Sequence, residues 1–200
     1  MISNEQRIMA LRQHLGDISL LTGKDIGEKY SVDFTGENRQ IPLAVVRPKS
    51  TKEVSLVLKA CSALAQRVVI QGGLTGLAGG ATPKQDEIAI SLERLSGIEE
   101  VDVDSMTLTA MAGTPLQTVQ EAAANAGLLL PLDYGARGSC HIGGAIATNA
   151  GGNQVIRFGM TRNLVLGLEA VLADGTIISS MNKMLKNNSG YDLKHLFIGT

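Results

Sequence analysis

The stretch LAVVRPKSTKEVSLVLKACSALAQRVVIQGGLTGLAGG, residues 43–80, indicates how the chain begins to fold. Residues 43–47 form a short apolar run that predicts a strand. Ser50 and Glu53 follow at the spacing of a capping box, ahead of apolar residues at helical spacing, which predicts an amphipathic helix. Residues 68–70 predict another short buried strand. Strand, helix and strand in this order predict a βαβ unit with parallel strands.

The residues that follow predict an antiparallel half. Short alternating runs occur at residues 88–92, 101–103 and 108–112, and the Asp-Ser pair between the last two favours a hairpin. Leucines at alternating positions within 164–172 precede an Asp-Gly turn and residues 176–180. This pattern predicts a second hairpin.

Two helices flank these strands. Asn4–Leu15 has apolar residues at helical spacing, whereas residues 16–40 are polar and irregular. Thr114, a proline and a glutamine open another helix, which Gly127 ends. We therefore expect an α+β fold with two lobes, a small parallel βαβ lobe and an antiparallel sheet lobe with flanking helices.

Charge and cysteine content exclude several classes of protein. The chain has 18 basic and 19 acidic residues, a net charge of −1, and no basic cluster that would hold nucleic acid. Cys61 and Cys140 have neither disulfide-framework nor metal-ligand spacing, which indicates a reducing compartment and no metal site. No apolar run approaches the roughly 18 residues of a membrane span, and the N-terminus lacks a signal sequence. We expect a cytoplasmic protein.

Glycine is over-represented, with 23 residues in 200, and two stretches concentrate it: QGGLTGLAGG (71–80) and GSCHIGGAIATNAGG (138–152). The first directly follows a predicted parallel strand, where open α/β sheets bind ligands. Successive glycines let backbone N–H groups turn inward and bind an anion, with no Cβ to hold a phosphate away. These stretches therefore favour a nucleotide pyrophosphate as ligand.

Two common nucleotide-binding motifs are excluded. Neither stretch contains the GxGxxG that opens a helix in a Rossmann fold, and no GxxxxGK[ST] occurs. A third interpretation stays open, in which the glycines serve only tight turns and close-packed backbone.

Four segments resemble the FAD-binding domain (PCMH-type) of FAD-linked oxidases related to vanillyl-alcohol oxidase: residues 71–81, 131–133, 138–152 and 157–159. Within that superfamily GSCHIGG, ATNAGG and GYDL (190–193) resemble the D-lactate and D-2-hydroxyglutarate dehydrogenase branch most closely. The resemblance implies a two-lobed domain with FAD between the lobes and its pyrophosphate held by the two glycine-rich stretches.

The resemblance also implies which residues contact the cofactor. Those expected to line the pyrophosphate are Gly72, Gly73, Leu74, Thr75, Gly76, Gly79 and Gly80. Those expected to follow the rest of the cofactor are Pro131, Asp133, Gly138, Ser139, Ile142, Gly143, Thr148, Asn149, Gly151 and Gly152, with Gly159 allowing a close approach to the flavin.

Three positions depart from the family pattern. Ile70 stands where many relatives have proline, and Leu74 stands where glycine or asparagine is common. If position 74 needs a positive φ, a leucine there is strained. Thr75 stands where some members carry the histidine that tethers FAD covalently. We therefore expect FAD to be bound non-covalently.

The resemblance implies that the complete protein oxidises a D-2-hydroxy acid of the lactate, glycolate or 2-hydroxyglutarate type by hydride transfer to FAD. The resemblance also implies that the base, the carboxylate-binding arginine and the metal-coordinating histidines come from a C-terminal substrate domain, which we expect to be absent from these 200 residues. Catalytic residues are therefore left unassigned. We expect an N-terminal helix and irregular lead-in over residues 1–40, and a FAD-binding domain over 41–200 that is truncated at its C-terminal edge.

The expected partners are a small hydroxy acid, through the absent domain, and an electron acceptor, with a partner chain or a homo-oligomer left open. One alternative is a stand-alone FAD-binding module or subunit without catalysis until it is paired with another chain. Another is a degenerate protein that keeps the fold and binds nothing.

Overall fold

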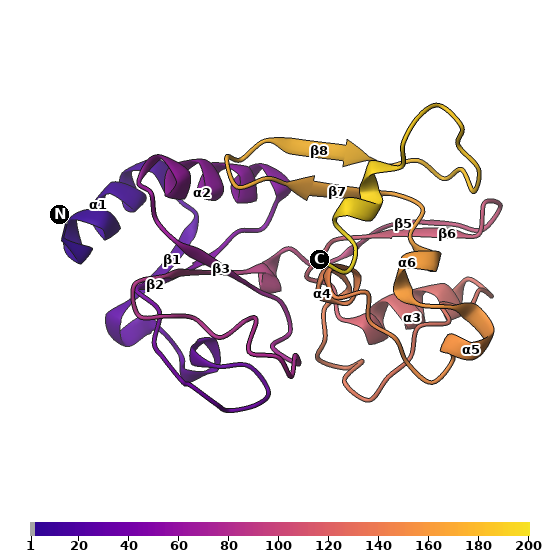
Figure 1. The fold of residues 1–200 in the computed structure, drawn as a ribbon, viewed down its shortest axis with the longest axis horizontal. Helices are drawn as coiled ribbons and strands as arrows, with labels where there is room; N and C mark the ends of the chain where they lie inside the picture. Colours follow the sequence, from indigo (N-terminus) through magenta and orange to yellow (C-terminus); the bar gives the residue numbers. More distant parts are fainter. Residues whose placement is uncertain (1–2) are drawn as a thin grey trace. The chain divides into compact units, whose positions relative to one another are not determined.

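A computed structural model describes residues 3–200 as two compact units. The first comprises the chain up to Leu95 together with Val171–Ile177, and the second comprises Ser96–Ala170 and Ile178–Thr200. The α+β class predicted from the sequence is confirmed, with a mixed sheet in the first unit and two-stranded sheets elsewhere (Figure 1).

The first unit contains a four-stranded sheet in the order β1-β2-β4-β3. The strands are β1 (Ser19–Thr22), β2 (Ala44–Arg47), β3 (Val68–Gln71) and β4 (Ile88–Ser91). Strands β2 and β3 each run parallel to β4, which confirms the predicted βαβ unit, and β1 pairs with β2 in the antiparallel direction.

Two expectations about these strands are wrong. Residues 88–92 were expected in the antiparallel half, but β4 lies between β2 and β3 and every one of its residues is buried. A short strand that is fully buried and mostly apolar is typical of the centre of a parallel sheet, where both faces are covered. Strand β1 lies within residues 16–40, which were expected to be irregular. Only its four residues pair with the sheet edge, and so short a run carries little strand pattern in the sequence.

Helices α1 (Asn4–Leu15) and α2 (Thr51–Ala63) form where the sequence predicts them, and Figure 1 shows α2 alongside the sheet. The hydroxyl of Ser50 accepts the N–H of Glu53, which is half of the predicted capping box. The Glu53 carboxylate instead accepts the N–H of Lys49, at 2.8 Å. The apolar side of α2 is buried, which ties the helix to the core of the first unit.

The segment between β1 and β2 covers one face of this sheet. It contains two short 3-10 helices, η1 (Gly23–Asp25) and η2 (Glu28–Ser31). Tyr30 packs in one buried cluster with Val45 of β2 and Ala89 of β4. Part of the expected irregular lead-in is therefore core.

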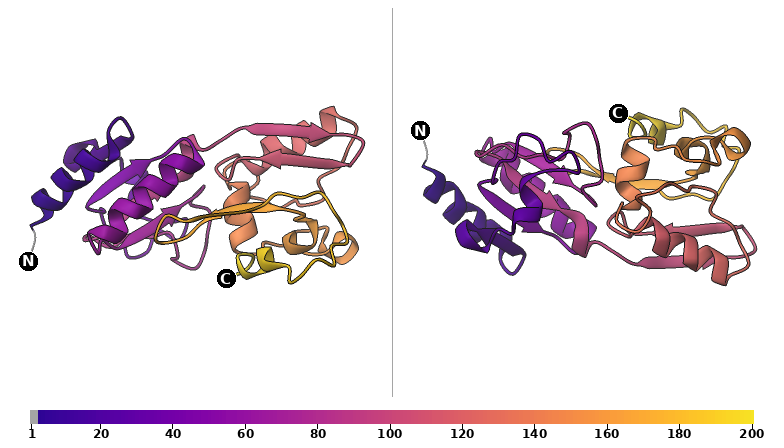
Figure 2. Two further views of the ribbon diagram at one scale, coloured as in Figure 1. Left: turned by 90° about the horizontal axis from the view of Figure 1, so that it is seen from above. Right: turned by 90° about the horizontal axis from the view of Figure 1, so that it is seen from below.

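The second unit begins with the predicted hairpin, β5 (Ile98–Asp102) and β6 (Thr107–Ala110), and α3 (Leu116–Asn125) packs against it (Figure 2). Gly127, at φ +74°, follows the end of α3 as predicted. The capping box expected at Thr114 does not form. The Thr114 hydroxyl donates to the carbonyls of Met111 and Gly97 instead, because Thr114 is buried against the turn before the helix.

The hairpin of β7 (Leu168–Val171) and β8 (Ile177–Ser180) also forms as predicted. Gly175 has φ +83°, and the N–H of Thr176 donates to the Asp174 carboxylate. The remaining elements are η3 (Leu92–Arg94), α4 (Ile142–Ala147), α5 (Val155–Phe158), α6 (Thr161–Leu164) and η4 (Leu193–Leu196). Within residues 3–200 no helix has both the length and the apolar character needed to cross a bilayer.

Candidate cofactor-binding site

The first glycine-rich loop, residues 72–80, directly follows β3 in the first unit. Among the described residues, none accepts a hydrogen bond from the backbone N–H groups of residues 74–78. A Cβ added at Gly76, Gly79 or Gly80 would meet no atom within 4 Å. The loop therefore presents five consecutive free donors beside open space, which is the donor set that an anion requires.

The backbone conformation of Leu74 confirms the strain expected for a leucine at this position. Its φ is +57°, in the left-handed region, which costs an L-residue other than glycine roughly 1–2 kcal/mol. Gly72, Gly73 and Thr75 beside it are half-buried. The Thr75 hydroxyl makes no hydrogen bond to any of residues 3–200, so it is available to a ligand.

Two buried polar side chains hold this loop. Gln71 is fully buried, and its Nε2 donates to the carbonyls of Tyr30 and Ala81, both at 2.9 Å. The N–H of Gly79 donates to Oδ2 of Asp33 at 2.8 Å. Gly79 therefore has no free N–H to offer a phosphate.

The second glycine-rich stretch, residues 138–152, folds onto its own unit. It contains α4, which the sequence had not indicated. A Cβ at Gly143 would lie 2.7 Å from the Cβ of Ala112, and a Cβ at Gly152 would lie 1.8 Å from the carbonyl oxygen of Asp133. The interpretation of glycine as close-packed backbone is therefore correct at Gly143 and Gly152.

Polar groups in this stretch are exposed but partly engaged. Ser139 and Thr148 are exposed, and the Thr148 hydroxyl donates to the carbonyl of Gly144. Asn149 has φ +47°, which asparagine tolerates, and its Oδ1 accepts the N–H of Arg162 at 2.9 Å. Ser139 retains a free hydroxyl, since it makes no side-chain hydrogen bond to the described residues.

The remaining predicted contacts are mostly packed within the second unit. Ile142 packs against a buried apolar cluster, and Pro131 is half-buried. A Cβ at Gly138 would meet the end of one side chain at 3.3 Å, and a Cβ at Gly151 would meet two side chains at 2.9 and 3.1 Å. Gly159, at φ +80°, would place its Cβ 2.5 Å from a side-chain amide nitrogen. The left-handed backbone alone requires glycine there.

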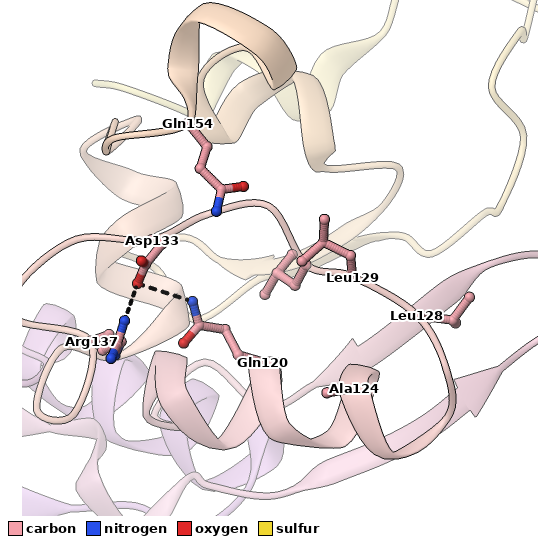
Figure 3. Close-up of a pocket in the computed structure, with 8 residues that line it drawn as sticks. Gln120, Ala124, Leu128, Leu129, Asp133, Arg137 and Gln154 are labelled. Atoms are coloured by element: carbon pink, nitrogen blue, oxygen red, sulfur yellow. Dashed lines mark hydrogen bonds and ion pairs between the residues drawn. The ribbon is translucent and has the colours of Figure 1, made fainter.

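Asp133 lies on the wall of a pocket of about 230 Å³ in the second unit (Figure 3). Its Oδ1 accepts from Arg137 at 2.8 Å and from Gln120 at 3.3 Å, and these two interactions lower the pKa of the carboxyl, Arg137 having the larger effect. Oε1 of Gln154 is buried and has no donor among the described residues. Apolar residues complete the lining: Ala124, Leu128, Leu129 and Leu130.

The two cysteines and Tyr134 are held in buried surroundings. Cys61 and Cys140 are free and buried, and burial raises the pKa of the Cys61 thiol to about 11. Burial of Tyr134 and its contact with Cys140 likewise raise the pKa of that phenol. Across residues 3–200 no three His, Cys, Asp or Glu side chains gather to share a metal ion.

Sequence reasoning missed Tyr30 and Asp33, which contact the glycine loop from the segment before β2. The residues Asp33 and Thr35 have the spacing of a local Asx turn, and the Asp33 carboxylate does accept the Thr35 N–H. That signal could have predicted the turn. It could not have named Gly79, which is 46 residues further along the chain.

Comparison with known proteins identifies the family of the chain. The family model described as an FAD binding domain matches residues 42–180. A probable mitochondrial D-2-hydroxyglutarate dehydrogenase of Oryza sativa subsp. indica is 43% identical over 199 residues, which is 100% of this chain and 36% of that protein. The D-2-hydroxyglutarate dehydrogenase of Xanthomonas citri pv. viticola is 44% identical over 196 residues, 98% of this chain and 42% of that protein.

Among solved structures, an alkyldihydroxyacetonephosphate synthase superposes with a TM-score of 0.81 at 19% identity, covering 98% of this chain and 37% of that one. This likeness concerns the fold alone. The chain spans about two fifths or less of the length of these proteins. Since the family model matches more than half of its residues, the chain belongs to the FAD binding domain family, and its cofactor is FAD.

Proposed function

We propose that the chain binds FAD non-covalently and that the N–H groups of residues 74–78 bind its pyrophosphate. The observation that supports this is the run of five amides without an acceptor among residues 3–200, next to glycines whose missing side chains leave open space. The peptide dipoles supply all of the positive potential in this loop, because residues 71–83 contain no Lys, Arg or His. Thr75 offers a hydroxyl and no tethering histidine.

In the second stretch we propose that three polar residues contact the rest of the cofactor: Ser139 and Thr148, which are exposed, and Asn149, which is half-buried. Gly143 and Gly152 would act by letting the backbone pack closely, so that they position these neighbours. Gly144 leaves the backbone of the same stretch accessible to a ligand, since no atom lies within 4 Å of where a Cβ would be, and only the end of the Gln117 side chain lies near that position at Gly138. At Gly151 the side chains of Met160 and Val155 fill this space.

For the complete protein we propose oxidation of a D-2-hydroxy acid, with an electron acceptor to reoxidise the cofactor. The support is that relatives 43% and 44% identical over nearly the whole chain carry the name D-2-hydroxyglutarate dehydrogenase. Bound FAD supplies a hydride acceptor. The residues of this chain bind and orient it, and we propose that the substrate-binding groups and the base lie in a further domain, as the relatives' greater length allows.

We keep the cytoplasm as the proposed location, because two free buried cysteines suit a reducing compartment. The rice relative is described as mitochondrial, so cell fractionation should decide between the two compartments. We propose no nucleic-acid partner, given the net charge of −1.

An absorption spectrum of the purified chain, with and without added FAD and after gel filtration, tests the proposal. We expect retained flavin with shifted bands, and a colourless pellet after acid precipitation. Protein that elutes without flavin under both conditions would refute FAD binding, and a yellow pellet would refute the non-covalent link. Turnover of a hydroxy acid that begins only when another chain is added would favour a subunit that needs a partner.

A further inference from the structure

The segment just before β2 reaches the glycine loop, although the family match begins only at residue 42. Resting on the proposed binding of FAD by this loop, we propose that Asp33 is a positioning residue. Its carboxylate holds the loop in the conformation that leaves the N–H groups of residues 74–78 free for the pyrophosphate.

Asp33 holds the far end of the loop through two hydrogen bonds. Its Oδ2 accepts the N–H of Gly79 at 2.8 Å, and its own N–H donates to the hydroxyl of Thr82 at 3.3 Å. Gly79 has φ +74°, a conformation that glycine adopts without strain. The N–H of Gly79 therefore points to Asp33, while the five N–H groups before it have no acceptor in the described part of the chain.

Gln71 holds the near end of the same loop. Its buried amide bridges the carbonyls of Tyr30 and Ala81, so the residues that enter and leave the loop are tied to one side chain. Gln71 is the last residue of β3, and Tyr30 belongs to the buried cluster on the sheet. The residues between these two anchors are constrained at both ends, which lowers the conformational entropy lost when a ligand binds.

Asp33 is itself rigidly held, which a positioning residue requires. It is only 5% exposed, and its Oδ1 accepts both the hydroxyl of Thr35 at 2.6 Å and the N–H of Thr35 at 3.0 Å. The hydrogen bond from the Thr35 hydroxyl, followed by those from backbone N–H groups, lowers the pKa of the carboxyl. These hydrogen-bond donors keep the carboxylate ionised, even though the neighbouring loop is proposed to bind another anion.

The test compares Asp33→Asn with Asp25→Asn in the 200-residue chain. The first variant keeps the shape of the side chain but replaces one carboxylate oxygen with an NH2 group. This NH2 group then faces the N–H of either Gly79 or Thr35, so one of these two hydrogen bonds is lost. The second removes an exposed carboxylate of η1 that makes no hydrogen bond to the described residues. Calorimetric titration gives the dissociation constant of FAD, and hydrogen exchange of the peptide covering 72–82 in the absence of FAD reports the order of the loop.

For D33N we expect FAD affinity to fall about tenfold or more, which corresponds to the loss of one charge-assisted hydrogen bond, and the loop to exchange faster. D25N should match the wild type in both measurements. If D33N binds FAD like the wild type, or if its loop exchanges no faster, the proposal is wrong while FAD binding stands. If the wild type binds no FAD, the proposed function fails, and the exchange data alone still test whether Asp33 orders the loop.

A milder variant covers the case in which D33N does not fold. Thr82→Val leaves the carboxylate intact and removes only the acceptor of the Asp33 N–H. We expect the same two changes in smaller measure, with an unchanged circular dichroism spectrum. Wild-type FAD affinity and wild-type loop exchange in a folded T82V protein would contradict the proposal.

Discussion

A methyl group added at Gly80 meets no atom within 4 Å, whereas one added at Gly152 falls 1.8 Å from the carbonyl oxygen of Asp133. Both glycines belong to stretches that look alike in the sequence. In the first stretch the backbone is open, and five N–H groups have no acceptor among the residues that the structure describes. In the second, Gly143 already donates its N–H to Ala112 and packs against it. Glycine can therefore expose a backbone to a ligand or let two backbone segments touch.

The difference also separates two kinds of consequence. Substitutions in the open stretch should change FAD binding and leave the fold intact. Substitutions at the closely packed positions should change the fold itself.

The largest expected effect is on folding, at Gly152→Ala. Because the new Cβ would overlap backbone that cannot move like a side chain end, we expect the free energy of unfolding to fall by about 3 kcal/mol, as for severe overpacking. Gly80→Ala should change it by less than about 0.5 kcal/mol, as at ordinary surface sites. Urea unfolding measures both. Equal stability of the two variants would contradict the distinction between an open first stretch and a closely packed second stretch.

The next effect is on binding, at Gly76→Ala. Its methyl group would occupy the open space beside the free N–H groups, so we expect the FAD dissociation constant to rise about tenfold, equivalent to about 1.4 kcal/mol. The melting temperature of the apoprotein should stay unchanged. Gly27→Ala, in the same unit and equally open, is the control and should bind FAD normally. A weakened G27A or an unaffected G76A would contradict the role of the loop.

A smaller effect is expected from relieving the strain at Leu74. Leu74→Asn should raise the free energy of unfolding by about 0.5–1 kcal/mol, because asparagine tolerates the left-handed region that costs leucine roughly 1–2 kcal/mol. The control is Leu77→Asn, an exposed loop leucine whose φ is not positive, which should be close to neutral. A destabilised L74N protein would show that the packing of this half-buried leucine matters more than its backbone.

The smallest effect concerns pH. Since the pKa of Asp33 is lowered in the folded chain, its contribution to stability is fully present above the unfolded value of about 3.9 and is lost as pH falls through the folded value below that. The melting temperature of the wild type should therefore exceed that of D33N at neutral pH, and the gap should narrow below about pH 4. A gap independent of pH between 3 and 7 would contradict this assignment of charge.

Much of the fold could be predicted because the signals are local. Ser50 marks the start of α2, Gly127 follows the end of α3, and the Asp174-Gly175 turn produces the β7–β8 hairpin. The position of β4 could not be predicted, since a run such as Ile88–Ser91 does not state which strands pair with it. Strand β1 was missed for a related reason, because four residues at a sheet edge carry too little pattern.

The candidate site divides in the same way. Resemblance identified both glycine-rich stretches and the unusual leucine at position 74, which has a positive φ. It could not separate open glycines from packed ones, because the atoms that crowd Gly143 and Gly152 come from residues 112 and 133. Nor could it assign Asp33, whose bond to Gly79 exists only in the folded chain.

Amide chemical shifts of the 15N-labelled chain, recorded as FAD is added, test the central claim most directly. If the free N–H groups of residues 74–78 bind the pyrophosphate, their proton resonances should move downfield, because each gains a hydrogen bond to a charged oxygen. The N–H groups of Gly79 and Gly143, which already have acceptors, should move little. FAD that binds with residues 74–78 unshifted would contradict the account.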